Sequence, residues 1–151
     1  MLDALRTKAS SRGLTNVEVV EAGFITYSHR GSPPGFVYTR NALHHLPDFW
    51  KAIALQRLAD LLPSGGVLLL RDIIYSFEPR EAAAKLETWF ASASPTADIG
   101  WTREELELHV RSEHSTFSWQ LEPMLARSGL GIDVVSHSES GTYSAYLCVK
   151  T

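Results

Sequence analysis

A continuous apolar run of strand length, "GVLLLRDII" at residues 66–74, constrains the fold of this chain more than any other feature. A strand that faces water on one side alternates apolar and polar residues, so this run predicts a strand buried on both faces, as in a parallel sheet covered by helices. The preceding stretch from Asp48 to Leu61 carries an apolar stripe at the helical period, which Asp48 can cap and "PSGG" ends. Phe36 to Thr39 predicts an earlier strand. Together these segments predict a strand–helix–strand crossover unit in an α/β fold.

The size and charge of the chain limit its partners. Its 151 residues suit a single domain, residues 1–151. The formal net charge of −3 does not indicate the basic surface that binding to nucleic acid requires. The longest apolar run, Val67 to Leu70, is far shorter than the roughly 20 residues that cross a bilayer. We therefore expect a soluble, cytoplasmic protein with a small-molecule partner, and neither nucleic acid nor membrane as a partner.

The rest of the chain continues the alternation of helices and strands. Helical spacing of apolar residues, a capping box and turn-forming residues mark the boundaries. The further elements that we expect are a helix over Met1–Arg12, a strand over Val17–Glu21, a helix from Pro79, a helix opened by Thr102 and Glu105, a helix over Ser115–Ser128 that Pro123 interrupts or delays, and a closing hairpin of "GIDVVSHS" and "TYSAYLCVK".

Three stretches together resemble class I S-adenosylmethionine-dependent methyltransferases. "GFVYTRNALHHLPD" is similar to the fourth strand of that family and its following loop, "ALQRLADLLPSGGVLLLRD" is similar to the next helix, turn and fifth strand, and the terminal strands resemble strands six and seven. The resemblance covers almost the whole chain. It implies a Rossmann-like sheet that is mostly parallel with a C-terminal antiparallel strand pair and helices on both faces. It also implies a cofactor, S-adenosylmethionine, bound at the carboxyl ends of the strands.

The resemblance also implies a truncated form of that fold. The glycine-rich turn after the first strand of the family and the acidic residue after its second strand have no counterpart here, so we expect weak or no cofactor binding. Those two strands would separate Val17–Glu21 from Phe36–Thr39. Either these two segments pair directly, or the exposed sheet edge pairs with a second copy in a homodimer, which we favour.

The resemblance assigns the cofactor site to two loops. Backbone amides of Gly23 and Phe24, with the Phe24 ring, would contact the adenine, because Ala22 cannot accept a hydrogen bond from the adenine amino group. The alternative is a strand-ending glycine and a core phenylalanine. The second loop follows Phe36–Thr39 and would lie beside the methionine moiety, unless its histidines merely start a helix. The implied cofactor-binding residues are Ala22, Gly23, Phe24, Arg40, Asn41, Ala42 and His44.

Catalytic and substrate contacts are expected at the end of the apolar run. Asp72 is a candidate general base or polar substrate contact, since partial desolvation can raise the pKa of a carboxyl toward neutrality. The alternative is a surface ion pair between Arg71 and Asp72. His44 is the second candidate catalytic residue. Tyr75 and Trp101 are expected to contact an apolar or aromatic acceptor, with helix packing as the alternative for such rings.

We expect no metal site. His44 and His45 are adjacent, so their side chains should diverge on a strand or a helix. The single cysteine, Cys148, rules out a zinc framework built on thiolates.

The expected function is S-adenosylmethionine-dependent methyl transfer to a small molecule, at O, N or C. The chain alone would have weak or no activity, or a partner chain would complete its cofactor site. The alternative is a non-catalytic association module.

Overall fold

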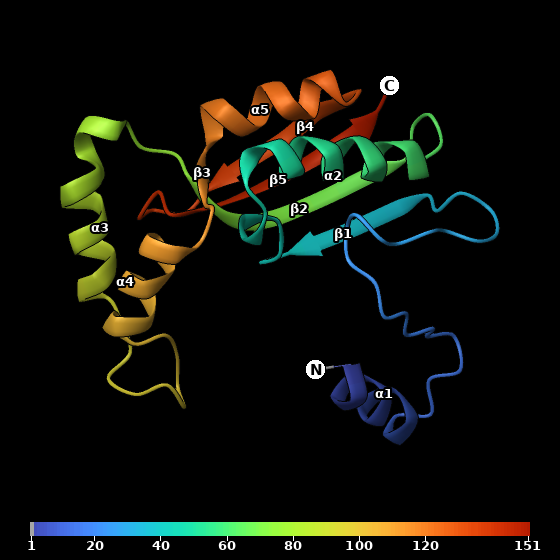
Figure 1. Ribbon diagram of the computed structural model, residues 1–151, viewed down its shortest axis with the longest axis horizontal. Coiled ribbons are helices and arrows are strands. Elements are labelled where there is room, and N and C mark those ends of the chain that lie inside the picture. The colour runs from blue at the N-terminus through green and yellow to red at the C-terminus, as the bar shows by residue number, and fades with distance from the viewer. Residues whose placement is uncertain (1) are drawn as a thin grey trace.

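The computed structural model describes residues 2–151, and a mixed sheet in the order β1-β2-β5-β4 forms its centre (Figure 1). β1 (Phe36–Arg40) and β2 (Val67–Tyr75) run parallel, with Phe36 opposite Val67 and Arg40 opposite Arg71. The crossover unit is therefore confirmed, and both strands end at the same edge of the sheet. The loop after β1 begins at this edge.

The remaining strands make the sheet mixed. β5 (Tyr143–Lys150) is antiparallel to both β2 and β4 (Leu130–His137), which confirms the closing hairpin. β3 (Thr116–Phe117) adds a short parallel pairing at the end of β2. The expectation of a mostly parallel sheet is wrong, because two pairings are parallel and two are antiparallel.

Most helices follow the sequence pattern, with shifts at their ends. The capping box of Thr102 and Glu105 is confirmed. Pro47, not Asp48, precedes the helix between β1 and β2, and Pro123 lies within the last helix. Every helix in residues 2–151 is too short or too polar to span a bilayer. The helical elements are α1 (Leu2–Ser11), η1 (Leu43–His45), α2 (Asp48–Leu61), η2 (Pro79–Glu81), α3 (Ala82–Ala91), α4 (Arg103–Ser112) and α5 (Ser118–Arg127).

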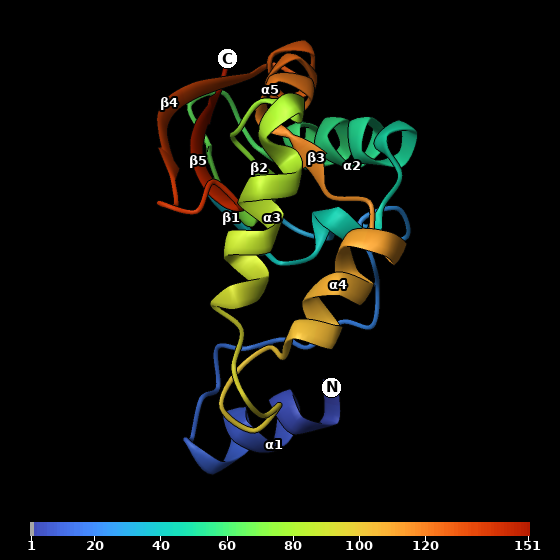
Figure 2. The same cartoon turned by 90° about the vertical axis from the view of Figure 1, so that its left-hand side faces the viewer.

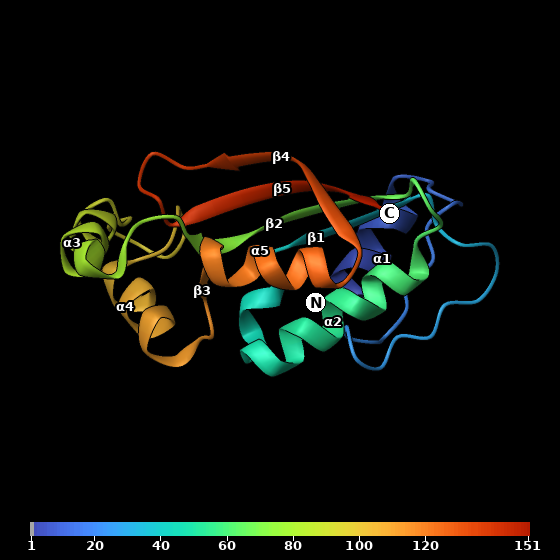
Figure 3. The ribbon, with the colours of Figure 1, turned by 90° about the horizontal axis from the view of Figure 1, so that it is seen from above.

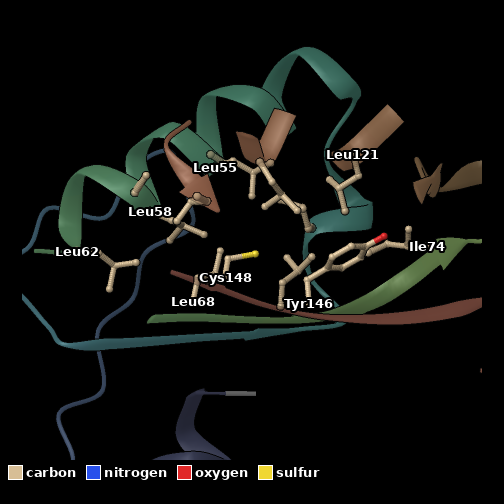
Figure 4. Close-up of a cluster of buried hydrophobic side chains, with 14 residues drawn as sticks. Leu55, Leu58, Leu62, Leu68, Ile74, Leu121, Tyr146 and Cys148 are labelled. Carbon is tan, nitrogen blue, oxygen red and sulfur yellow. The ribbon is translucent and has the colours of Figure 1, made fainter. Parts of the chain in front are cut away.

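The main core lies between the sheet and two helices, α2 and α5, which both cover the same face (Figure 3). Leu55 of α2, Leu68 of β2 and Leu121 of α5 are fully buried there, together with Tyr146 and Cys148 of β5 (Figure 4). Each such leucine contributes about 1.5–3 kcal/mol of burial free energy.

The opposite face of the sheet remains partly open to solvent. Leu69 on β2 and Leu147 on β5 point to this face and are only half-buried, and β4 is exposed along most of its length. Within residues 2–151, helices therefore cover the two faces unequally: α2 and α5 pack along one face, whereas the other meets helices only at the end of β2, where Ile73 and Tyr143 pack with Trp89 of α3 and Leu106 of α4.

A second, aromatic cluster packs beyond the carboxyl end of β2, where α3 and α4 lie (Figures 1 and 2). It joins Tyr75, the last residue of β2, and the nearby Phe77 to Trp89 of α3 and Leu106 of α4. This cluster holds the segment between β2 and β3 against the edge at which β1 and β2 end.

The segment before β1 differs most from expectation. Residues 17–21 form no strand, and Val17 and Val20 are exposed. α1 buries none of its described residues and lies apart from the sheet (Figures 1 and 2). A strand needs a partner for its backbone groups, and this segment pairs with no edge, so both direct pairing with β1 and the expected strand are wrong.

Candidate functional site

A buried carboxylate organises the loop after β1. Asp72, near the end of β2, is 1% exposed, and its Oδ1 lies 2.5 Å from Nδ1 of His44. Its Oδ2 accepts hydrogen bonds from the backbone N–H groups of Ala42 at 3.1 Å and Leu43 at 2.8 Å. The N–H of Ile73 donates to Oδ1 at 2.8 Å. One side chain of β2 therefore fixes both the backbone of η1 and the ring of His44.

These contacts set the charge state of Asp72. Burial by itself would raise the pKa of this carboxyl, but the hydrogen bond and charge of His44, with the amides of Ile73 and Leu43, outweigh it and hold the pKa below its usual value. The expectation of a raised pKa is wrong. The expected ion pair with Arg71 is wrong too, because Arg71 points to the open face and is exposed. Asp72 is an anchored carboxylate.

Asn41 makes the turn between β1 and η1. Its φ is 49°, the left-handed region that asparagine tolerates better than most residues. Its N–H donates to the carbonyl of Arg71 at 2.9 Å, so the turn is tied to β2. Backbone conformations of this kind often occur at functional sites.

Three histidine rings gather next to this turn. The ring centroid of His44 lies 4.1 Å from that of His45 and 4.8 Å from that of His109 on α4. Burial, followed by the charge of His44, lowers the pKa of His109 to about 4, so this ring is neutral at pH 7. Nδ1 of His45 lies 2.8 Å from Oε2 of Glu113 at the end of α4. The expectation that His44 and His45 diverge is wrong, because η1 places their rings side by side.

A larger and a smaller cleft lie near this turn, and the larger, about 800 Å³, is between α2 and the loop before β1. Arg57 of α2 holds that loop by donating to the carbonyls of Phe24 at 3.1 Å and Tyr27 at 2.7 Å. Four of the expected cofactor residues line this cleft together: Ala22, Gly23, Phe24 and Ala42.

The smaller cleft, about 440 Å³, lies where β1 and β2 end. It brings together four expected residues, Arg40, Asn41, Asp72 and Trp101. The sequence interpretation missed the hairpin residues that complete it. Their alternating polar pattern was a signal, but only the register of β5 beside β2 places them here: Ser136, His137, Ser138, Tyr143, Ser144 and Ala145.

Two expected site residues line neither cleft. His44 is 3% exposed and lies behind the turn, against Asp72. Tyr75 packs in the aromatic cluster, with ring centroids 5.3 Å from Phe77 and 5.8 Å from Phe117. Of the two expectations for Tyr75, contact with the acceptor or packing, the structure therefore shows packing.

The chain matches no protein-family model and no curated protein. Solved structures do match it. An O-methyltransferase family 2 protein from Planctomyces limnophilus, in complex with apigenin, is 17% identical with a TM-score of 0.66, covering 99% of this chain and 40% of that chain. NcsB1, an O-methyltransferase from neocarzinostatin biosynthesis in complex with S-adenosylmethionine and 2-hydroxy-5-methyl naphthoic acid, is 18% identical with a TM-score of 0.62, covering 99% and 38%. The [4+2]-cyclase SpnF is 11% identical with a TM-score of 0.68, covering 99% and 62%.

These similarities show that the chain has a methyltransferase fold, as the sequence resemblance implied. The chain spans about two fifths of the length of the two O-methyltransferases. SpnF is described as a cyclase, so the fold by itself does not define the reaction.

Proposed function

We propose that this chain takes part in S-adenosylmethionine-dependent methyl transfer to a small molecule with a hydroxyl group, and that it has weak or no activity alone. One observation carries the proposal: Asp72 and His44 form a buried pair where two parallel strands end. Ala42 beside this pair lines the larger cleft, and Asp72 lines the smaller one. Open parallel sheets bind their ligands at such an edge.

The larger cleft partly fits the cofactor. Phe24, Val37 and Leu58 give it an apolar wall suited to a planar purine, beside the backbone of Gly23. Ala22, which also lines this cleft, cannot accept a hydrogen bond from the adenine amino group, and this supports weak binding. When bound, S-adenosylmethionine would supply an electrophilic methyl group.

The residues of this chain would activate and place the acceptor. His44 would take the proton from the acceptor hydroxyl on Nε2, because Nδ1 faces Asp72. Since His44 lines neither cleft, the loop after β1 would have to move for the acceptor to reach this nitrogen. The anchored carboxylate of Asp72 would hold the ring in place, so Asp72 is a positioning residue rather than the base. Trp101 and Tyr143 in the smaller cleft offer aromatic surfaces to a planar acceptor.

Calorimetric titration with S-adenosylhomocysteine tests the cofactor site. We expect a dissociation constant of about 1 mM, and weaker binding in Phe24→Ala. Val20→Ala is a matched control, because Val20 is exposed and lines neither cleft. No saturable binding up to about 10 mM would overturn the cofactor assignment, whereas a dissociation constant of a few micromolar would overturn the weak affinity.

The second candidate function is association with a further copy of the chain. The outer edge of β1 pairs with no strand in residues 2–151, and Phe36 and Tyr38 on β1 are half-exposed. An open strand edge of this kind favours pairing between chains. We expect light scattering to show a dimer at about 100 μM, which Tyr38→Lys shifts to a monomer. A wild-type monomer at that concentration would contradict this candidate.

A further inference from the structure

We propose that His44, His45 and Glu113 form a binding site for a divalent transition-metal ion of the zinc class. One ligand atom from each of these three residues lies within 4.8 Å of the others. η1 contributes both histidines, and the residue directly after α4 contributes the carboxylate. Segments 68 residues apart thus bring two imidazoles and a carboxylate together.

His44 is already oriented as a metal ligand. Its Nδ1 faces the anchored carboxylate of Asp72, which leaves Nε2 as the nitrogen that can bind a metal. Within residues 2–151, Nε2 has no hydrogen-bond partner, and since Thr39 Oγ1 is the fully buried side-chain atom that lacks one, Nε2 keeps some access from outside. Metal-binding histidines commonly direct their other ring nitrogen to a carboxylate in this way, which fixes the ring and strengthens the ligand.

The other two ligands are free to adjust. The side chains of His45 and Glu113 are 57% and 31% exposed, and they contact each other at 2.8 Å. A tetrahedral zinc ion with bonds of about 2.0–2.2 Å needs ligand atoms about 3.4 Å apart. Small rotations of these two side chains around the fixed His44 ring would meet that requirement, and bonds to the metal would replace the contact between His45 and Glu113.

The ligand set selects the kind of ion. Two imidazoles and one carboxylate suit zinc, cobalt or nickel, whereas calcium and magnesium prefer oxygen ligands alone. Three protein ligands leave a fourth position for water. His109 stays outside the set, because it does not belong to the group of ligand atoms that lie within 4.8 Å of one another.

Metal binding would have a consequence for methyl transfer. Nε2 of His44 has one lone pair, so a bound ion would occupy the atom that the proposed function assigns to the acceptor. The ion would therefore inhibit transfer. This consequence rests on the proposed function, whereas metal binding itself does not.

Titration of metal-free protein with Zn²⁺ tests the site, and Co²⁺ absorption reports its geometry. We expect one Zn²⁺ per chain and a tetrahedral Co²⁺ spectrum. His45→Gln and Glu113→Gln should each weaken binding about tenfold or more. Both side chains lie at the surface, so circular dichroism should show an intact fold in each variant.

His114→Gln is the matched control, because His114 is exposed and directly follows Glu113. It should bind Zn²⁺ like the wild type. Unsaturable binding, unchanged affinity in both ligand variants, or an equal loss in His114→Gln would each overturn the proposal. The titration contains neither cofactor nor acceptor, so its outcome is independent of the proposed function.

Discussion

The backbone nitrogen of Leu43 lies 2.8 Å from Oδ2 of Asp72, 29 residues further along the chain. This bond, the contact with His44 and two further amides leave the carboxylate of Asp72 fully engaged. The turn after β1 therefore takes its shape from a side chain of β2, and the stability of the turn depends on the negative charge of that side chain.

Asp72→Asn should lower the free energy of unfolding by about 2–4 kcal/mol, because an amide cannot accept all of these bonds and leaves buried donors without partners. Urea denaturation measures the change. Asp133→Asn on exposed β4 is the control and should change stability by less than about 0.5 kcal/mol. An equal effect in both variants would contradict the anchoring role.

Asn41→Val should destabilise the protein by about 1–2 kcal/mol, because a β-branched residue resists the left-handed conformation with φ of 49°. Asn41→Gly keeps that conformation accessible and should leave the melting temperature close to that of the wild type. Thermal denaturation of the two variants compares them directly. Tolerance of valine at this position would show that the turn does not need the left-handed conformation.

Leu55→Ala should cost about 2–5 kcal/mol, since Leu55 is fully buried between α2 and the sheet. Phe49→Ala, on the same helix but 68% exposed, should cost less than about 0.5 kcal/mol. Chemical denaturation gives both values. Similar losses would mean that the face of α2 bearing Leu55 is not the one packed on the sheet.

Cys148 should resist thiol reagents in the folded protein. Burial raises the pKa of this thiol to about 11, so the reactive thiolate is scarce at pH 8, and the side chain has no exposure to solvent. Labelling with a chromogenic disulfide should therefore follow unfolding, with full reaction in denaturant. Rapid labelling under native conditions would contradict a buried position.

The crossover unit could be predicted because its pattern is local. The apolar run at residues 66–74, the stripe on α2 and the "PSGG" turn define β2, α2 and their connection from sequence alone. Residues 17–21 carry an equally reasonable strand pattern, yet strand formation needs a partner edge that a local pattern does not reveal. That is why this strand was predicted wrongly.

In the candidate site, too, some features could be predicted from local sequence and others depend on distant contacts. Loop positions such as Gly23, Phe24 and Ala42 follow from order along the chain, and the structure brings them to one cleft. The lowered pKa of Asp72 does not follow from order along the chain. Desolvation alone would raise this pKa, and only the contacts that the folded chain makes with Asp72, chiefly from η1, lower it. The contact between His45 and Glu113 could not be predicted either, because it depends on where the end of α4 lies in the folded protein.

The hydrogen bonds from Arg57 to the carbonyls of Phe24 and Tyr27 divide the N-terminal region into a part held against α2 and a part that precedes it. In the part that precedes these hydrogen bonds, α1 and residues 14–21 are largely exposed and contribute little to the packing of the protein. Because a helix side chain rather than a strand ladder secures the wall of the larger cleft, a protease nick near Val17 should detach the leading peptide while the ligand-facing wall stays in place.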